Sequence, residues 1–241
     1  MIAASIFQGR LLTLSRVILS LSKPILIINM SDSTSTTPRI PNWDLRYSEK
    51  EYAFGEGPNL FFKSELEKLT SGKLLLPAEG EGRNGVFAAK IGWDVIAFDK
   101  SVQGKVKAEA LAQSQGVSLK YDICDIAEVS YENDQFDALG FIYLHFPKED
   151  KKKNYQRLFP FLKKGGYVIA EMFSDKHLPY REKNPNVGGP HNFEFLFSRA
   201  EIEDIFEGFE ILFLKEEIVD LKEGKYHNGT GSVFRLLALK K

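Results

Sequence analysis

Cysteine is almost absent from this sequence, since Cys124 is the only one among 241 residues. A single cysteine excludes a disulfide within the chain and a zinc site built from four cysteines. Proteins without disulfides are typical of reducing compartments, so we expect a cytoplasmic protein. Histidine is scarce too, and its four copies show no ligand spacing, so we predict no metal site.

The sequence also lacks a surplus of either charge. It has 32 lysines and arginines against 33 aspartates and glutamates, a formal net charge of -1. No long basic stretch is available to neutralise nucleic-acid phosphates, so no nucleic-acid partner is expected. The most basic run, residues 148–153, contains two acids and is typical of a solvated helix start. We expect a small-molecule partner, and nothing in the sequence points to a particular oligomeric state.

Long uninterrupted hydrophobic runs are absent as well. Residues 1–29 are rich in Ile, Leu and Ser and contain no acid, but Arg16 and Lys23 interrupt them. They are a poor membrane span, and no membrane partner is expected. Two interpretations stay open: an organelle-targeting segment, or an upstream extension before a start at Met30. We predict that residues 1–42 form an N-terminal extension, disordered or non-native, ahead of one domain over residues 43–241.

Within residues 43–241, strand-like apolar runs alternate with helical patterns, the signature of a parallel α/β sheet. Strands are expected at 73–76, 94–98, 118–121, 136–143, 167–173, 209–214 and 232–239. Helices are expected at 82–91, 105–115, 150–162 and 198–206. Ser198 and Glu201 are predicted to form a capping box, and Gly165 and Gly166 a turn after the third helix. The long Pro- and Gly-rich connection after residue 173 suggests a functional lid.

A glycine turn joins the first of these strands to the first helix. Gly80, Gly82 and Gly85 satisfy G-x-G-x-x-G. Asp99 ends the next strand, where a carboxylate can accept the hydroxyls of a ribose. Taken alone, this pattern predicts a nicotinamide dinucleotide.

The charge of the turn favours a different ligand. Glu79 and Glu81 lie among its glycines, and two carboxylates would repel the pyrophosphate of a dinucleotide. S-adenosylmethionine has a ribose but no phosphate, and its sulfonium and ammonium groups are cations that suit an acidic turn. Asp125, after the third strand, is a candidate acceptor for the adenine amino group, and Asp122 is the competing candidate.

These residues resemble class I S-adenosylmethionine-dependent methyltransferases, in particular the branch of tellurite-resistance, thiopurine and halide/thiol methyltransferases. The matching stretches are WDLRYSEKEYAFGEGPN (43–59), EGEGRN (79–84), VIAFDKS (95–101), ICDI (123–126), LHFP (144–147), LKKGGYVIAE (162–171) and VGGP (187–190). The resemblance implies a Rossmann-like doubly wound sheet of about seven strands, mostly parallel with the last strand antiparallel.

The motif and the resemblance together indicate which residues bind the cofactor. They lie in the glycine turn and at the ends of the following strands: Glu79, Gly80, Glu81, Gly82, Arg83, Asp99, Lys100, Asp125, Ile126 and Phe141. Leu76 stands where the family has an acid, and Ala78 replaces the first motif glycine. Glu79 is therefore the expected substitute ligand for the methionine ammonium.

Methyl transfer needs alignment and exclusion of water more than covalent help, because the sulfonium already activates the methyl group. Aromatic and basic side chains before the first strand are expected to cover the cofactor or the acceptor: Trp43, Arg46, Tyr47, Tyr52 and Phe54. His145, after the fourth strand, is the candidate base, and Tyr143 is the second candidate catalytic residue.

The predicted function is transfer of the S-adenosylmethionine methyl group to a small acceptor, a soft nucleophile such as a thiol, a halide or a species derived from a metalloid oxyanion. The sequence shows no base beside an orienting acid, which favours an acceptor that needs none. Two alternatives stay open. One is an NAD(P)-dependent oxidoreductase, against which the acidic turn and the lack of a Tyr-x-x-x-Lys pair count. The other is a non-catalytic S-adenosylmethionine-binding protein.

Overall fold

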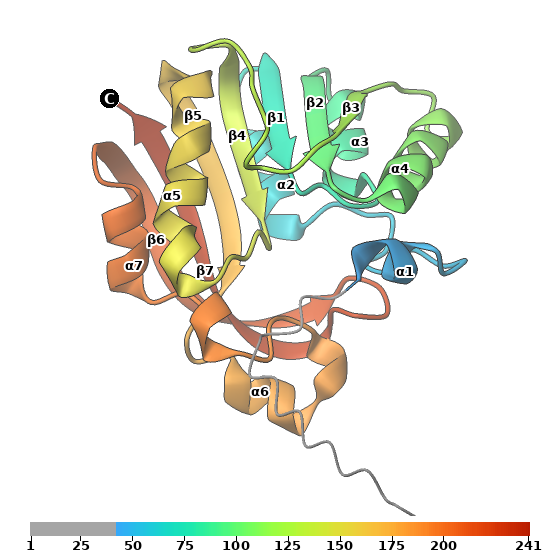
Figure 1. Ribbon diagram of the computed structural model, residues 1–241, viewed down its shortest axis with the longest axis vertical. Helices are drawn as coiled ribbons and strands as arrows, with labels where there is room; N and C mark the ends of the chain where they lie inside the picture. The colour runs from blue at the N-terminus through green and yellow to red at the C-terminus, as the bar shows by residue number, and fades with distance from the viewer. Residues whose placement is uncertain (1–41) are drawn as a thin grey trace, which may run out of the picture. The chain divides into compact units, whose positions relative to one another are not determined.

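The computed structural model describes residues 42–241, and the expectations for residues 1–41 lie outside them. The described chain forms a seven-stranded sheet in the order β3-β2-β1-β4-β5-β7-β6 (Figure 1). Its strands are β1 (Lys73–Pro77), β2 (Asp94–Asp99), β3 (Lys120–Ile123), β4 (Phe136–Ile142), β5 (Leu162–Phe173), β6 (Phe209–Lys222) and β7 (Asn228–Lys240).

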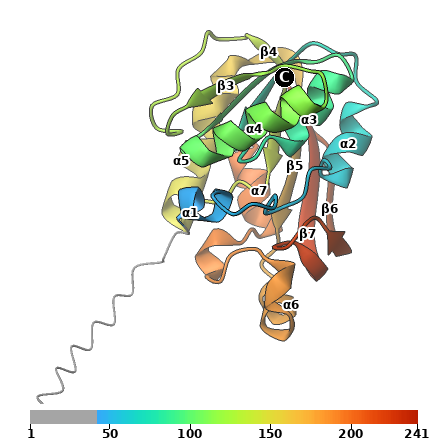
Figure 2. The ribbon, with the colours of Figure 1, turned by 90° about the vertical axis from the view of Figure 1, so that its right-hand side faces the viewer.

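Helices cover both faces of the sheet (Figure 2). They are α1 (Trp43–Tyr47), α2 (Leu60–Leu66), α3 (Arg83–Lys90), α4 (Val102–Ser114), α5 (Lys148–Leu158), α6 (Leu178–Lys183) and α7 (Arg199–Ile205). Buried side chains of α2, α3 and α4 form one core against the sheet, and those of α5 and α7 form the other. No helix among the described residues is long and apolar enough to cross a membrane.

Six of the seven strands run in the same direction, whereas β7 is antiparallel to both of its neighbours, β5 and β6. Strand β1 pairs on both sides and is buried from its second residue on, which explains its continuous apolar run. The expected doubly wound α/β fold with an antiparallel last strand is confirmed. The capping box is present too, since Ser198 and Glu201 bond each other's backbone at the start of α7.

Three local expectations differ from the structure. Helix α5 ends at Leu158, before a 3-10 turn over Phe159–Phe161 that contains Pro160. Gly165 and Gly166 lie inside β5, where the pairing with β4 shifts register, rather than in a turn after the helix. The third strand begins at Lys120, two residues later than expected.

The hairpin of β6 and β7 is much longer than the sequence suggested. Strand β6 ends at Lys222, where the sequence predicted a strand over 209–214. Strand β7 begins at Asn228, where the sequence predicted a strand over 232–239. The extension is charged and alternates between exposed and half-buried positions, so it carries no apolar run. In Figure 1 it curves beneath the carboxyl ends of the parallel strands and reaches α1.

The segment between β5 and α7 lies below the same ends (Figure 1). It contains α6 and two 3-10 turns, so it is not a structureless loop. The imidazole of His177 ties it to the hairpin: Nε2 lies 3.0 Å from the Gly188 carbonyl oxygen, and Nδ1 accepts from the Ser232 amide at 3.3 Å.

Candidate functional site

The glycine turn after β1 needs its glycines for close packing. Gly80 and Gly82 have φ values of 62° and 86°, in the left-handed region. A Cβ atom on Gly80 would lie 2.6 Å from the Tyr47 hydroxyl, and one on Gly82 would lie 2.5 Å from the Ala108 Cβ atom. The turn therefore lets α1 and α4 approach its backbone.

Glu79 is buried beneath the turn, with its carboxylate at the N-terminus of α3. Its Oε1 atom accepts from the backbone amides of Asn84 and Gly85 at 2.8 and 2.7 Å. Gly82, at the N-cap position, has no side chain to do this. Burial raises the pKa of Glu79 to about 7, against the lowering effect of these amides. The helix terminus that usually binds a phosphate is thus already occupied by a carboxylate of the protein.

The other charged residues of the turn connect it to distant segments. Glu81 accepts from the Ala53 amide and from Lys107 Nζ, both at 2.7 Å. Arg83 donates to Glu223 Oε2 at 3.0 Å and to the Phe54 carbonyl oxygen at 3.3 Å. The segment before β1 is therefore fixed over the turn.

Asp99 lies at the end of β2, facing the turn. Its two oxygens accept from the amides of Gly80 at 3.1 Å and Ser101 at 2.9 Å. The residue is 9% exposed, and burial raises the pKa of its carboxyl group. The remaining lone pairs of this carboxylate are suited to the two hydroxyls of a ribose.

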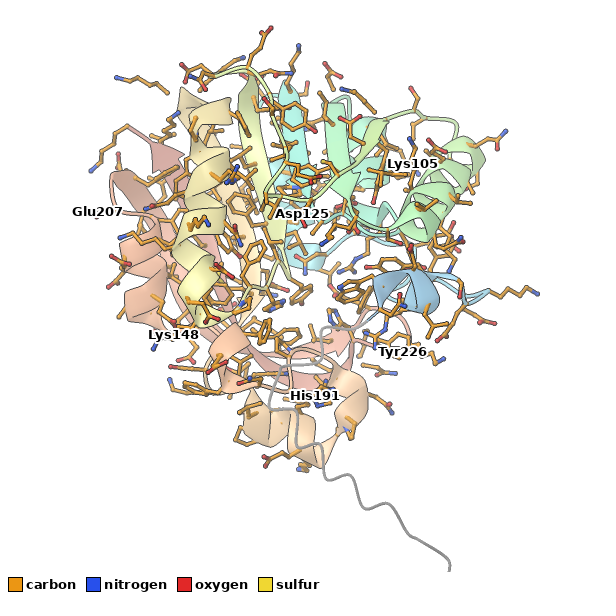
Figure 3. All side chains as sticks on the ribbon, in the orientation of Figure 1. Lys105, Asp125, Lys148, His191, Glu207 and Tyr226 are labelled. Atoms are coloured by element: carbon orange, nitrogen blue, oxygen red, sulfur yellow. The ribbon has the colours of Figure 1, made fainter. Side chains whose placement is uncertain are left out.

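The expected adenine edge lies beside Asp99. Lys100 Nζ pairs with Asp125 Oδ2 at 2.7 Å (Asp125 is labelled in Figure 3), and Ile126 follows directly. The competing Asp122 accepts from the Tyr131 hydroxyl at 3.1 Å. The ring of Phe141 packs edge-on against Tyr155 in the core, which leaves its backbone as the group for a ligand. We call the glycine turn, Asp99 and this edge the cofactor side.

The predicted cover is largely brought together. Trp43 stacks on Tyr47 with ring centroids 5.5 Å apart and lies 6.4 Å from Phe54. The Arg46 guanidinium lies 4.2 Å from the ring centroid of Tyr226, which Figure 3 shows beside α1. Tyr52 differs, because it packs on α4 and its hydroxyl donates to the Lys107 carbonyl oxygen at 3.1 Å.

Tyr143 follows β4 with a left-handed φ of 55°, a costly conformation that is concentrated at functional sites. Its hydroxyl donates to Glu171 Oε1 at 2.6 Å. Glu171 is fully buried and also accepts from Asn59 Nδ2 and Arg235 Nε, each at 2.6 Å. Burial raises the pKa of the Tyr143 hydroxyl well above its usual value, and the Glu171 carboxylate adds to the shift. Tyr143 is therefore a hydrogen-bond donor at neutral pH.

His145 stacks on Phe173 with ring centroids 5.8 Å apart. Its Nε2 atom is buried and has no hydrogen-bond partner within residues 42–241. Burial lowers the pKa of this imidazole to about 3, so it is neutral in the physiological range. A buried ring nitrogen without a partner is suited to accept from a polar group of a bound molecule.

The structure adds groups that the sequence analysis did not select: Asn59, Glu223 and His227. Glu223 and His227 lie in the five-residue loop of the long hairpin, with His227 Nδ1 3.1 Å from Glu223 Oε2. Gly224 between them, with a φ of 71°, is the turn signal that could have revealed the hairpin. We call Tyr143, His145, Glu171, Glu223 and His227 the acceptor side. The part of the chain seen here holds no cluster of three metal-ligating side chains.

Residues 77–166 match the family model described as a methyltransferase domain. The match assigns this segment, and not the whole chain, to a methyltransferase domain. The matched segment begins at the last residue of β1 and extends into β5, so it includes the whole cofactor side. A search of curated proteins finds no match.

Solved structures of similar fold agree. A protein studied for the conversion of a disulfide bond into a thioacetal group in echinomycin biosynthesis superposes with a TM-score of 0.65 at 16% identity, covering 80% of this chain and 85% of that one. A SAM-dependent methyltransferase of Methanosarcina mazei superposes with a TM-score of 0.60 at 16% identity, covering 73% of this chain and 96% of that one. TehB of Haemophilus influenzae superposes with a TM-score of 0.59 at 19% identity, covering 75% of this chain and 61% of that one.

At these identities the similarity shows the fold, which is the Rossmann-like fold of methyltransferases. The predicted fold and the predicted enzyme class, a methyltransferase, are confirmed. S-adenosylmethionine is the cofactor of this class of enzyme.

Proposed function

We propose that this chain transfers the methyl group of S-adenosylmethionine to a small soft nucleophile, in the branch of tellurite-resistance, thiopurine and halide/thiol methyltransferases. The observation that carries the choice of cofactor is the Glu79 carboxylate bound to the Asn84 and Gly85 amides. A dinucleotide would place its pyrophosphate at these amides, next to an acid. S-adenosylmethionine has no phosphate to place there.

The residues of the cofactor side fit this molecule. Gly80 and Gly82 allow close approach to the turn backbone, and Asp99 faces it with free lone pairs for the ribose hydroxyls. Asp125 and Ile126 stand at the adenine edge. When bound, S-adenosylmethionine supplies an electrophilic methyl carbon on a sulfonium. Trp43, Tyr47 and Phe54 present aromatic rings that attract such a cation.

Two observations support a soft acceptor. The acceptor side is lined by aromatic rings, with Tyr143 stacked 4.9 Å from Phe173 and His145 on the same ring. Such a wall excludes water from a polarisable nucleophile. In addition, the echinomycin protein of the same fold is described by a conversion at sulfur.

The proposal is tested by offering the protein S-adenosylmethionine with one acceptor at a time and measuring S-adenosylhomocysteine by mass spectrometry. The panel contains an alkyl thiol, an aryl thiol, iodide, selenite, tellurite and arsenite, with an alcohol and an amine as matched controls. We expect turnover with at least one soft acceptor and none with the controls. Turnover with the controls alone would contradict the acceptor class. Binding of S-adenosylhomocysteine without turnover on any acceptor would favour a non-catalytic binding protein.

A further inference from the structure

His227 and Glu223 form a buried histidine–carboxylate pair in the loop of the β6–β7 hairpin. His227 is 4% exposed, and its Nδ1 atom lies 3.1 Å from Glu223 Oε2. Arg83 donates to the same oxygen at 3.0 Å, and Asn59 Nδ2 donates to Oε1 at 3.1 Å. The hairpin thus brings the His227 imidazole to the site, and its partner Glu223 is held in place by hydrogen bonds from Arg83 and Asn59.

The charge state of Glu223 fixes the tautomer of His227. Burial would raise the pKa of Glu223, but the Arg83 guanidinium and His227 hold it at about 2. An ionised carboxylate can only accept, so Nδ1 of His227 carries the proton and Nε2 keeps its lone pair. No residue of the described chain donates to Nε2.

The ring of His227 lies among the walls of the acceptor side. Its centroid is 4.4 Å from that of Tyr143, 4.5 Å from Phe54 and 5.4 Å from Phe173. Tyr143 follows β4 and Phe54 belongs to the cover of the cofactor side. His227 therefore stands where the two sides meet.

Several charged or titratable groups act on the His227 imidazole from the elements around it. Burial lowers its pKa, Glu223 opposes that shift, and the guanidinium groups of Arg83 on α3 and Arg46 on α1 lower it further. Tyr143, His145 and His177 also lie nearby and are neutral in the physiological range, and Glu171 on β5 is held in an ion pair with Arg235. The imidazole is thus unprotonated at neutral pH, and unlike His145 it has an acid that stabilises its protonated form.

We propose that His227, oriented by Glu223, removes the proton of the methyl acceptor, and that the acceptor is a thiol. This inference rests on the proposed function and narrows it. A halide carries no proton, so a base would be superfluous. A thiol, with a pKa of about 8.5, is a far better matched proton donor to an imidazole than an alcohol is.

The step balances without a further reactant. The S–H proton moves to His227 Nε2, and the electron pair of the acceptor sulfur forms the new bond to the methyl carbon. The electron pair of the broken carbon–sulfonium bond stays with the leaving thioether. His227 then returns its proton to water, and Glu223 keeps the ring orientation throughout.

The test compares His227→Gln and Glu223→Gln with wild type, using an alkyl thiol, an aryl thiol that is already ionised at the assay pH, and iodide. A positioned base contributes about 10²–10⁴-fold. We expect His227→Gln to lose about 100-fold or more in kcat/KM with the alkyl thiol and less than about tenfold with the other two. The rise of wild-type kcat/KM with pH through the His227 pKa should disappear. The control His191→Gln, at an exposed histidine that bonds Arg181, should match wild type.

Two readouts do not depend on turnover. The Cε1–H proton resonance of His227 should titrate in the apo protein, and Glu223→Gln should lower the pKa that it reports. Calorimetry should give the same S-adenosylhomocysteine affinity for His227→Gln as for wild type, which shows that the cofactor side is intact in that variant.

The outcomes separate this inference from the proposed function. Equal kcat/KM of His227→Gln and wild type on the alkyl thiol, or a His227 titration that ignores Glu223, would overturn the inference alone. A wild-type protein that methylates only iodide would also overturn it. So would a loss of kcat/KM with the alkyl thiol that appears in His145→Gln and not in His227→Gln. A wild-type protein that neither binds S-adenosylhomocysteine nor methylates any acceptor would overturn both.

Discussion

The cofactor side and the acceptor side lie along one edge of the sheet, but different contacts hold them. Glu79 bonds amides five and six residues further along, and Asp99 bonds an amide 19 residues before it. On the acceptor side, Glu171 bonds Asn59 across 112 residues, and Glu223 bonds Arg83 across 140. The cofactor side is therefore a local motif, whereas the acceptor side is assembled from distant segments. A short motif can specify the first, but the second exists only after the chain has folded.

The largest effect should come from breaking the long-range contacts. Glu171→Ala leaves Arg235, Asn59 and Tyr143 without a common acceptor in a buried place. Removing one partner of a buried ion pair typically costs about 3–5 kcal/mol. We expect urea denaturation to show a loss in that range.

The matched control is Glu203→Ala, in an exposed ion pair with Arg199 on α7. Its stability should change by less than about 0.5 kcal/mol. Equal effects of the two substitutions would mean that the acceptor side is not a structural unit.

Asp99→Asn addresses the cofactor side. Hydrogen bonds to a charged group contribute about 1.5–3 kcal/mol, so the affinity for S-adenosylhomocysteine should fall at least tenfold in calorimetry. Asp94→Asn, at the exposed opposite end of the same strand, should bind as wild type does. An unchanged affinity in Asp99→Asn would refute the assignment of Asp99 to the ribose.

Substitutions in the predicted aromatic cover should have a smaller effect on cofactor affinity, and they distinguish Phe54 from Tyr52. Phe54 lies between Trp43 and His227, whereas Tyr52 packs on α4. An aromatic face contributes about 0.5–2 kcal/mol to holding a cation. Phe54→Ala should therefore weaken S-adenosylmethionine binding up to about thirtyfold, and Tyr52→Ala should weaken it less. The reverse order, measured by calorimetry, would place Tyr52 rather than Phe54 over the cofactor.

The smallest effect is a pH dependence of stability at His145. The folded pKa of about 3 lies below the ordinary histidine pKa of 6.5, so below pH 6.5 the unfolded state binds a proton that the folded state does not. The contribution is complete above pH 6.5 and is lost progressively as pH falls towards 3. Between pH 7.5 and 5.5 the loss is about 1.4 kcal/mol.

Glu79 acts in the opposite direction, because the folded state binds its proton more tightly than the unfolded state does. Its contribution to stability is therefore lost as pH rises from about 4.5 to 7. The difference between wild type and His145→Gln removes this shared background. Urea denaturation should show the variant gaining about 1.4 kcal/mol on wild type from pH 7.5 to pH 5.5. A constant difference would mean that His145 is solvated.

The fold and the cofactor side could be predicted from sequence because their signals are local. Gly80, Gly82 and Asp99 have a fixed spacing around one strand–turn–helix unit. Even there, spacing placed Glu79 as a ligand of the methionine ammonium without revealing the helix amides that it bonds. That role for Glu79 stays a prediction.

The acceptor side could not be predicted because its hydrogen-bond partners are far apart in the sequence. In addition, the hairpin that carries Glu223 and His227 has no apolar run at its extended end. Residues 215–222 are mostly charged, and their strand forms by pairing with β7, with Leu221 as its one buried side chain. The sequence therefore showed no base beside an acid, whereas folding places His227 against Glu223. The premise that no base lies beside an acid therefore does not hold in the folded chain, and whether the acceptor needs a base stays a prediction.

The central claim is that Glu79 makes this glycine turn a site for S-adenosylmethionine and not for a dinucleotide. Calorimetric titration of the wild-type protein with S-adenosylhomocysteine and with NAD tests it most directly. We expect S-adenosylhomocysteine to bind in the micromolar range, about −8 kcal/mol, and NAD to give no binding heat. Binding of NAD as tight as or tighter than that of S-adenosylhomocysteine would contradict the account.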